Sequence, residues 1–455
     1  MKIVIEGAGQ VGSHLAKMLA NESNEITVID PDPVRVRQLA SSADVNTLVG
    51  GPSSIQLLRE AGCDRADLFI AVNPTRNQNV NIVSALLAKK LGAKRVISRI
   101  DNEHYLAPEN KLLFKDMGMD MMFFPEKSAS DEIVDLLRHS TSTDTLDFAR
   151  GKLQLAVFKL DDDSPLLDMN VKEFSHAVKA MQADADFRIV AISRGGNTLI
   201  PTFDTSFKYK DYLYIITLRD GMPALLKYLG KDQVDVRRVI ILGGSEVGEM
   251  VASRLAALKL DDIKIVDIDP QRCRQLSEDL PDAVSVSCGD ARNADFLQEE
   301  DIRNYQAVLA VTGNDEANIL CCVVAKKLGV QRVIAQVENL EYLRLAEDMG
   351  VDSVVNKKLI TASRIFKFTL SDKVRSVRYI SGTDAEVLEY TAAPDSRITR
   401  GTLKEIDFPK NAIIGGVIRG GESFIAVGHS RIEAYDRVAV FALPEAVKEV
   451  DRMFK

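Results

Sequence analysis

The chain repeats itself, and this duplication restricts the possible folds more than any other feature. Segment 3–12 reads IVIEGAGQVG, and segment 239–248, which begins 236 residues later, reads VIILGGSEVG. The pentapeptide AKKLG occupies both 88–92 and 325–329. Chance would not keep such matches in nearly one register, and the period far exceeds that of a solenoid repeat. The sequence therefore indicates duplicated domains.

The segments between these two regions repeat as well. Arg194-Gly195-Gly196 corresponds to Arg419-Gly420-Gly421, which lies 225 residues later. The order is therefore A–B–A–B. We expect domains at residues 1–140, 145–230, 235–370 and 375–455. Linkers are expected where charged and small polar residues interrupt the patterns, near Ser140–Thr145, Gly230–Asp235 and Ser371–Arg375.

The two kinds of domain differ in their hydrophobic patterns. In the A segments, short apolar runs such as Lys2–Glu6 and Ile26–Ile29 alternate with longer helical patterns such as Asn79–Leu91. This alternation predicts an α/β fold with a doubly wound parallel sheet, which is Rossmann-like. In the B segments, short alternating strands surround one helix near Lys172–Met181. We predict that each B segment is a small α+β domain.

Composition excludes several classes of protein. The net charge is −8 and the chain has no run of five or more Lys or Arg, so we expect no nucleic-acid partner. We find no apolar run approaching the roughly 18 residues that span a bilayer, so we expect no direct membrane insertion. Five cysteines without a C-x-x-C pair do not indicate a disulfide framework. We therefore expect a cytoplasmic protein.

The first repeat carries a dinucleotide fingerprint between a predicted strand and a predicted helix. Gly7 permits a tight turn, Gly9 lets the backbone approach a pyrophosphate, and Gly12 lets helix and strand pack closely. Asp30 follows at the end of the next predicted strand, where its carboxylate would accept hydrogen bonds from ribose hydroxyls. The predicted nucleotide-binding residues of this loop are Gly7, Ala8, Gly9, Gln10, Val11 and Gly12.

The second repeat changes the fingerprint. Ser245 replaces the middle glycine, whereas the outer glycines and Asp267 remain. Either the Ser245 hydroxyl donates a hydrogen bond to phosphate, or this second site binds weakly or is empty. The candidate residues are Gly243, Gly244, Ser245, Glu246, Val247, Gly248 and Asp267.

Further candidates lie at the carboxyl ends of other predicted strands, where open α/β sheets bind ligands. Ordinary loop and helix-capping roles are the alternative for each of them. Arg99 could reach a phosphate or could form an ion pair, and its counterpart in the second repeat is the uncharged Gln336. The other candidates are Ser53, Asn73 and Pro74 in the first repeat and Asp290 and Thr312 in the second.

With these motifs assembled, the sequence resembles the TrkA family, whose members consist of two tandem RCK modules (regulator of potassium conductance). Besides the two fingerprints, the resemblance is carried by Leu58–Gly62, Cys288–Asp290 and Ala310–Asn318. It implies a cytosolic, non-enzymatic subunit that assembles as a dimer or tetramer ring on a membrane potassium transporter. It also implies a response to NAD(H), or to ATP and ADP, through the first fingerprint, Asp30, the Asn73 loop and Arg99.

Two segments depart from the family pattern. The usual Gly-x-Gly-Ser after the third strand is Gly50-Gly51-Pro52-Ser53, and the usual Asp-Glu of the fourth-strand loop is Arg76-Asn77. The second change reverses the charge near the predicted pocket.

Two other functions were weighed. An NAD-dependent oxidoreductase would need a proton-transfer side chain near the nicotinamide, and the sequence offers no residue that we can place there. A nucleotide-sensing transcription regulator would need a basic helix-turn-helix, and no such segment is recognisable. The sequence therefore favours a nucleotide-binding regulatory subunit.

Overall fold

The chain forms two compact units. The computed structural model describes residues 1–20, 24–73, 78–138, 145–148, 152–160, 164–181, 186–195, 197–218, 221–229, 236–366, 368, 370, 374–379 and 385–455. One unit contains Met1–Ala129 and Lys357–Thr369, and the other contains Ser130–Asn356 and Leu370–Lys455. The linkers expected near 140–145, 230–235 and 371–375 lie wholly or largely outside the described residues.

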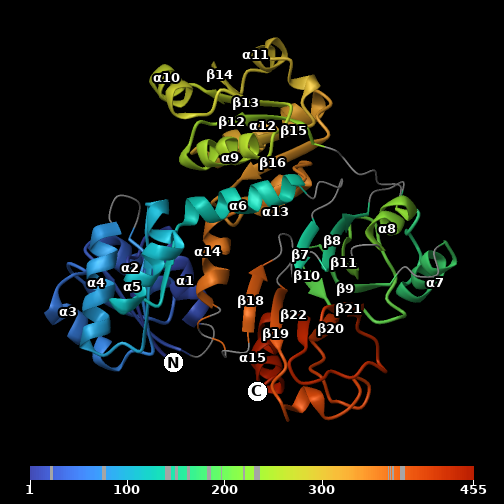
Figure 1. Cartoon of the computed structure of the whole chain (residues 1–455), viewed down its shortest axis with the longest axis horizontal. Coiled ribbons are helices and arrows are strands. Elements are labelled where there is room, and N and C mark those ends of the chain that lie inside the picture. Colours follow the sequence, from blue (N-terminus) through green and yellow to red (C-terminus); the bar gives the residue numbers. More distant parts are fainter. Residues whose placement is uncertain are drawn as a thin grey trace. The chain divides into compact units, whose positions relative to one another are not determined.

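The first unit, whose helices α1 to α5 are labelled in Figure 1, is built on a parallel six-stranded sheet with the order β3-β2-β1-β4-β5-β6. The order reverses direction between β1 and β4, which is the place where open α/β sheets typically bind ligands. The strands are β1 (Lys2–Glu6), β2 (Glu25–Asp30), β3 (Asn46–Val49), β4 (Leu68–Ala71), β5 (Arg95–Arg99) and β6 (Met121–Phe123). The helices are α1 (Gln10–Ala20), α2 (Pro33–Ser42), α3 (Ile55–Glu60), α4 (Gln78–Leu91) and α5 (Pro108–Asp116), and α6 (Pro125–Arg138) begins in this unit and ends in the other.

The central strands of this sheet are apolar because helices cover both of its faces. Ile3, Val4 and Ile5 of β1 are fully buried, and such continuous apolar runs are typical of parallel strands. On α4, small side chains such as Ala85 and Ala88 face the sheet and permit close packing. The sheet thus forms a rigid base beneath the loop that follows β1.

The second unit contains a sheet with the same strand order, β14-β13-β12-β15-β16-β17, which is also parallel. Its strands are β12 (Arg238–Leu242), β13 (Asp262–Asp267), β14 (Val284–Cys288), β15 (Ala307–Ala310), β16 (Arg332–Gln336) and β17 (Ser353–Val355). The accompanying helices are α9 (Glu246–Ala257), α10 (Pro270–Asp279), α11 (Ala294–Glu299), α12 (Asp315–Lys327) and α13 (Tyr342–Asp348). The predicted duplicated α/β fold class is confirmed.

The same unit holds two antiparallel five-stranded sheets, with the orders β10-β9-β11-β8-β7 and β18-β19-β22-β20-β21. The first comprises β7 (Thr145–Phe148), β8 (Leu153–Lys159), β9 (Phe187–Arg194), β10 (Asn197–Leu199) and β11 (Tyr212–Leu218), with α7 (Val171–Met181) and α8 (Met222–Tyr228). The second comprises β18 (Val374–Tyr379), β19 (Glu386–Thr391), β20 (Ala412–Arg419), β21 (Glu422–Ile425) and β22 (Arg437–Ala442), with α15 (Pro444–Met453). Where one helix was expected in the first of these domains, α7 and α8 are both present.

The two antiparallel sheets share one hydrophobic core. Leu153 and Tyr214 from the first sheet and Val387 and Phe441 from the second belong to the same buried cluster. A Cβ on Gly416 would lie 2.8 Å from the side chain of Leu153, so the glycine lets β20 pack closely against this leucine of β8. The two C-terminal domains are therefore held together inside one chain.

A helix connects the repeats in a way the sequence did not predict. The helix α14 (Lys357–Phe366) follows the second parallel sheet in the sequence, yet it belongs to the first unit and packs against α1. Its buried residues include Ala362, Ile365 and Phe366. No helix within the described ranges is both long and apolar enough to span a lipid bilayer.

Candidate functional site

The loop after β1 has the geometry of a phosphate-binding turn. Gly7 has φ +103°, and a Cβ there would lie 3.0 Å from the Asn73 nitrogen, so a side chain is excluded. A Cβ on Gly12 would lie 1.8 Å from the Gly7 carbonyl oxygen. Around Gly9, by contrast, a Cβ would meet nothing within 4 Å among the residues that the structure describes, which do not include 74–77. The first and last glycines therefore serve packing, and the middle one borders open space at the N-terminus of α1.

The Asp30 carboxylate holds this loop in place. One oxygen accepts a hydrogen bond from the Ala8 nitrogen at 2.6 Å and the other from the Asp32 nitrogen at 2.8 Å. The side chain is only 2% exposed. Each oxygen still has a free lone pair by geometry, but Asp30 must share its carboxylate between the loop and a ribose. Its predicted contact with ribose stays a prediction.

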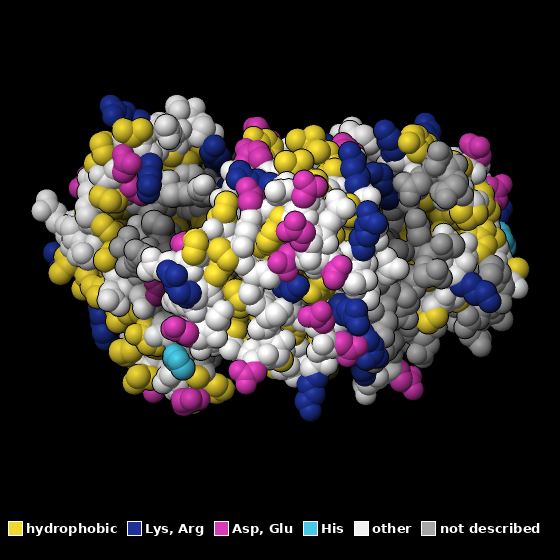
Figure 2. All heavy atoms as spheres, turned by 90° about the horizontal axis from the view of Figure 1, so that it is seen from above, with side chains coloured by type: hydrophobic (Ala, Val, Ile, Leu, Met, Phe, Trp, Pro, Cys, Tyr) yellow, Lys and Arg dark blue, Asp and Glu magenta, His cyan; other side chains and the backbone are white. Residues whose placement is uncertain are grey.

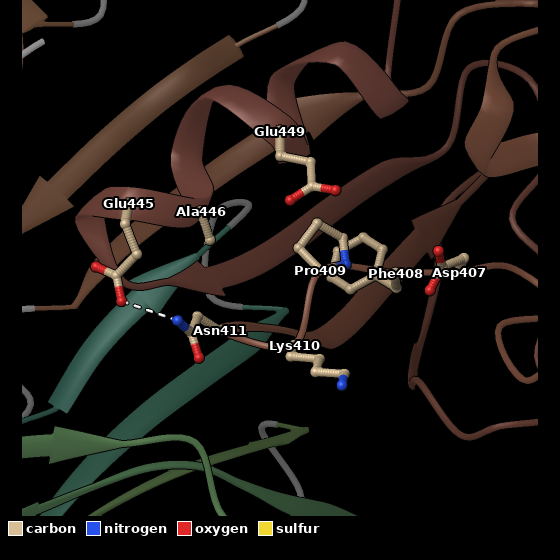
Figure 3. A pocket seen from close by; sticks show the side chains of 8 residues that line it. All are labelled: Asp407, Phe408, Pro409, Lys410, Asn411, Glu445, Ala446 and Glu449. Atoms are coloured by element: carbon tan, nitrogen blue, oxygen red, sulfur yellow. Dashed lines mark hydrogen bonds between the residues drawn. The ribbon is translucent and has the colours of Figure 1, made fainter.

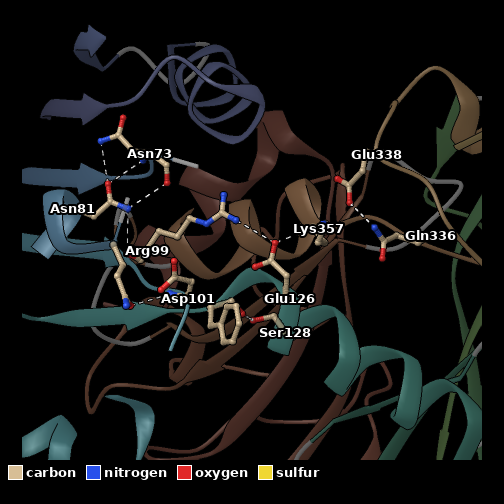
Figure 4. A network of polar contacts seen from close by, with 11 residues as sticks. Asn73, Asn81, Arg99, Asp101, Glu126, Ser128, Gln336, Glu338 and Lys357 are labelled. Carbon is tan, nitrogen blue, oxygen red and sulfur yellow. Dashed lines mark hydrogen bonds and ion pairs between the residues drawn. The ribbon is translucent and has the colours of Figure 1, made fainter. Parts of the chain in front are cut away.

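A buried polar cluster lies directly beneath the loop. Glu6, the last residue of β1, is fully buried, and its carboxyl group is hydrogen-bonded to the Asn73 amide and the Ser84 hydroxyl. Asn81 accepts hydrogen bonds from the Asn73 backbone nitrogen at 3.1 Å and from its amide at 3.0 Å. Asn81 also donates to the Arg99 carbonyl oxygen at 3.2 Å. Figure 4 shows Asn73, Asn81 and Arg99 in this arrangement. The cluster ties together the ends of β1, β4 and β5.

This arrangement changes the roles of two residues. Burial raises the pKa of Glu6 from 4.5 to about 8, although its hydrogen bonds to Ser84 and Asn73 partly oppose the shift. The Asn73 side chain points into the cluster and not into solvent, so it holds the end of β4 in place. Pro74 and the Arg76-Asn77 pair of the same loop lie outside the described residues.

Arg99 takes part in an ion pair. Its guanidinium lies 3.1 Å from Glu126 near the start of α6, and both side chains are buried. The Lys357 ammonium of α14 lies 3.6 Å from the same Glu126 oxygen (Figure 4). Glu126 therefore links the end of β5 to α14. The ion pair expected for Arg99 is present, and its contact with a phosphate stays a prediction.

The second glycine loop is partly closed by its own side chains. Ser245 donates to the Val311 carbonyl oxygen at 2.6 Å, and its hydroxyl oxygen accepts from the Gly248 nitrogen at 3.3 Å. The serine therefore caps α9 and uses a backbone N–H that a phosphate would otherwise bind. Its proton is already committed to Val311. Of the two alternatives for the second site, this geometry favours weak or absent binding over a hydrogen bond from Ser245 to phosphate.

Arg272 of α10 lies across the second loop. It donates to the Gly244 carbonyl oxygen at 2.6 Å and forms an ion pair with Glu249 at 2.5 Å. Asp267 is hydrogen-bonded in the same way as Asp30 in the first repeat. Its carboxylate oxygens accept from the Gly244 nitrogen at 2.6 Å and from the Asp269 nitrogen at 2.8 Å. The second loop thus has a cation beside it that the fingerprint did not reveal.

The other predicted residues lie in the loops that follow other strands of the two parallel sheets. Ser53 is exposed in the turn after β3. Asp290 forms paired hydrogen bonds with Arg292, which hold the pKa of the carboxyl below its usual value. Thr312 donates to Asn318 at 2.6 Å. Gln336 donates to Glu338 at 3.2 Å and brings no charge of its own.

Sequence reasoning missed the residues that support these loops. Glu6 was read only as part of an apolar strand, and Asn81, Ser84 and Glu126 were not singled out. A buried carboxylic acid directly before a glycine loop was the one available signal for Glu6. Glu126 could not be found in this way, because its partners come from β5 and from a helix more than 200 residues away.

A separate hollow lies in the second C-terminal domain (Figure 3). It has a volume of about 300 Å³ and is closed at one side by the hydrogen bond from Asn411 to Glu445, at 2.9 Å. None of the residues predicted to bind a nucleotide lines it. Its lining residues are Asp407, Phe408, Pro409, Lys410, Asn411, Glu445, Ala446 and Glu449.

Comparison with known proteins identifies the family. The TrkA-N domain model matches residues 3–125 and 239–357, and the TrkA-C domain model matches residues 155–230 and 387–455. This chain belongs to the TrkA family. The four matched segments follow the A–B–A–B order, and the resemblance inferred from the motifs is confirmed.

Full-length relatives agree with this assignment. The "Trk system potassium uptake protein TrkA homolog" of Archaeoglobus fulgidus is 33% identical over 457 residues, covering 100% of both chains. The "Trk system potassium uptake protein TrkA" of Halomonas elongata is 32% identical over 460 residues, covering 100% of this chain and 99% of the relative.

Solved structures share the TrkA-family fold. The GsuK RCK domain superposes with a TM-score of 0.59 at 16% identity, covering 99% of this chain and 94% of that chain. The GsuK channel bound to NAD superposes with a TM-score of 0.58 at 16% identity, covering 99% and 78%. At this level of identity the likeness concerns the fold alone.

Proposed function

We propose that this TrkA-family chain is a nucleotide-binding regulatory subunit of a membrane potassium-uptake transporter, held at the cytoplasmic face of the membrane through that partner. Its full-length relatives are named as Trk potassium-uptake proteins. We propose NAD(H) as the ligand of the first glycine loop, with ATP and ADP as competitors. The observation that carries this is the open space beside Gly9 at the start of α1.

Helix electrostatics support an anionic ligand in this space. The first N–H groups of any α-helix have no partner within the helix, and its dipole favours negative charge there. The turn at Gly7 directs the chain so that α1 begins at Gln10, next to the open space. Phosphate oxygens placed beside Gly9 would therefore accept these N–H groups, with Asp30 available to the ribose. We propose that the second loop binds more weakly, because Ser245 already caps α9.

We propose that the ligand is sensed through the ion pairs at Glu126 and not chemically altered. A phosphate near Arg99 would compete with Glu126 for the guanidinium and so weaken the link to Lys357 of α14. Helix α14 packs on α1 and leads in sequence to β18 of the second C-terminal domain. A ligand that favours one arrangement of these contacts would shift the equilibrium of the whole chain.

Exposed apolar side chains support self-association into a ring. Val83 on α4 and its counterpart Leu320 on α12 are 48% and 47% exposed. Leu113 on α5 and Leu345 on α13 form a second exposed pair. Matched apolar positions on both repeats fit contacts with further copies of the same chain. The mass of the particle in solution, measured by light scattering, tests this part of the proposal.

On the face seen in Figure 2, acidic and basic side chains of the described residues are interspersed. A surface of mixed charge differs from the single-signed basic surface that binds nucleic acid. We therefore keep a protein, the transporter, as the proposed partner.

Calorimetric titration with NADH, NAD⁺, ATP and ADP tests the nucleotide site. At Gly9 a Cβ would meet no described atom within 4 Å, so Gly9→Glu should retain the fold while its carboxylate repels phosphate. We expect at least a tenfold loss of affinity at the first site, or about 1.4 kcal/mol. Gly428→Glu adds the same charge in the second C-terminal domain, where a Cβ makes only an ordinary contact with Lys404 at 3.7 Å, and should bind as the parent does.

Equal affinities of the parent and Gly9→Glu would contradict the proposed site. The bound nucleotide should also be recovered unchanged after incubation with the transporter. Its conversion to an oxidised or hydrolysed product would instead support an enzyme.

A further inference from the structure

Two cysteines meet beside the second glycine loop. Cys273 lies in the first turns of α10, and Cys288 is the last residue of β14. The Cys273 thiol lies 3.3 Å from the Asp267 carbonyl oxygen and 3.7 Å from the carbonyl oxygen of Ser287, the residue before Cys288. The Cys288 thiol lies 4.0 Å from the Ile268 carbonyl oxygen. Cys288 is exposed, whereas Cys273 is buried. The sulfur atoms thus lie on one peptide segment, and one of them is open to solvent.

That segment carries the acid of the second site. Asp267 ends β13 and pairs with Cys288 in the sheet register. Both of its carboxylate oxygens are held by backbone N–H groups, at Gly244 and at Asp269. A ribose would therefore have to share the carboxylate with these donors, as at Asp30. A covalent bond between α10 and β14 would restrict the adjustment of the carboxylate that such sharing needs.

We propose that Cys273 and Cys288 form a reversible disulfide when the chain meets a low-molecular-weight disulfide, and that this bond lowers nucleotide affinity at the second site. The second half of this inference rests on the proposed nucleotide-binding function, whereas disulfide formation does not.

The chemistry proceeds by two thiol–disulfide exchanges. The exposed Cys288 thiolate attacks one sulfur of the small disulfide, forms a mixed disulfide and releases one small thiolate, which takes up a proton. The Cys273 thiolate then attacks the Cys288 sulfur and expels the second small thiolate. The protein loses two hydrogens, and the small disulfide is reduced to two thiols. Burial raises the pKa of Cys273 to about 11, so this second step should accelerate as the pH rises.

The rest of the chain supplies controls. The first repeat has Val36 and Val49 at the positions of Cys273 and Cys288, and Val49 pairs with Asp30 as Cys288 pairs with Asp267. The first site should therefore not respond to oxidation. The three remaining cysteines are buried, and burial raises the pKa of each thiol, which makes them poor nucleophiles; they are Cys63, Cys321 and Cys322.

The first measurement is intact mass after incubation of the whole chain with oxidised glutathione. We expect a loss of about 2 Da, and a peptide map that joins Cys273 to Cys288, both reversed by dithiothreitol. Cys273→Ser should stop at the mixed disulfide on Cys288, and Cys288→Ser should react much more slowly. A stable mixed disulfide on the parent chain, or no reaction, would overturn the proposal.

The second measurement is calorimetric titration of the Gly9→Glu variant, which leaves the second site to be observed, with ATP and NADH before and after oxidation. We expect a severalfold loss of affinity on oxidation, absent in Cys288→Ser. Equal affinity in both states would overturn the regulatory half. If the reduced chain binds no nucleotide while the disulfide still forms, the proposed function fails at this site and the disulfide stands on its mass alone.

Discussion

At the scale of single residues, two glycines three positions apart make opposite predictions. A Cβ on Gly12 would lie 1.8 Å from the Gly7 carbonyl oxygen, whereas one on Gly9 would meet no described atom within 4 Å. Gly12→Ala should therefore destabilise the first unit by about 1–3 kcal/mol, and Gly9→Ala should leave its stability nearly unchanged. Urea unfolding followed by circular dichroism measures both variants. Equal midpoints for the two would show that the loop does not have this geometry.

Glu6 gives the second prediction. Its pKa is raised to about 8 in the folded chain from an ordinary value of 4.5. The folded state keeps the proton that the unfolded state loses, so the contribution of Glu6 to the free energy of unfolding is full below about pH 4.5. It declines by about 1.4 kcal/mol per pH unit as the pH rises towards 8.

Glu6→Gln should abolish this decline, because an amide can bond to Asn73 and Ser84 without ionising. The variant should gain stability relative to the parent as the pH rises from 5 to 8, in denaturant unfolding at each pH. Glu60→Gln, at an exposed position of α3, is the matched control and should show no such gain. A pH-independent difference for Glu6→Gln would contradict a neutral buried carboxyl.

The sequence predicted the residues that form the glycine loop better than those that support it. Gly7 and Gly12 could be assigned because steric demands leave no other residue type at such turns. The partners of Glu6 could not, because Asn73 and Ser84 reach it only after β1 and β4 have paired in the sheet. Long-range polar contacts of this kind leave no periodic signal in a single sequence.

At the scale of elements, the capping of α9 makes the third prediction. Ser245→Gly restores the middle glycine and frees the Gly248 N–H from the serine hydroxyl. Glycine is a fair N-cap, so the variant should lose only a few tenths of a kcal/mol of stability. Its second site should bind nucleotide more tightly than that of the parent, measured by calorimetry in the Gly9→Glu background. Unchanged or weaker binding would mean that the serine does not limit this site.

Elements with strong periodicity were predicted well. The expected helix at Asn79–Leu91 is observed as α4 over Gln78–Leu91, and the strand expected at Ile26–Ile29 lies within β2. The helix α8 was missed because its seven residues are too few to establish a period. The position of α14 on α1 was also missed, since packing between repeats depends on contacts and not on local propensity.

At the scale of the whole molecule, the fourth prediction concerns α14, which follows the second parallel sheet in the sequence but belongs to the first unit. Lys357→Met removes the ammonium that pairs with Glu126 but keeps a flexible side chain of similar length. Nucleotide affinity at the first site should change by less than threefold, whereas the effect of nucleotide on potassium flux in proteoliposomes should fall. Lys326→Met, which removes a half-buried ion pair with Asp352, is the control. Full regulation in Lys357→Met would contradict signalling through this pair.

Duplication allowed the two glycine loops to diverge within one chain. The first repeat keeps an open loop, whereas the second adds a capping serine, a nearby arginine and a thiol pair. The shared core of the two C-terminal sheets joins the repeats, so a change at either site can affect the same assembly. This division of labour could not be predicted from the fingerprint alone, because both repeats retain its outer glycines and its acid.

Hydrogen exchange of the full chain with and without saturating NADH tests the central claim most directly. A nucleotide at the first loop should protect the backbone amides of residues 8–13, and the signal through Glu126 should change exchange in α14 at the same time. We expect both effects in the parent chain and neither in Gly9→Glu. Protection confined to other segments, with residues 8–13 and α14 unchanged, would contradict the account.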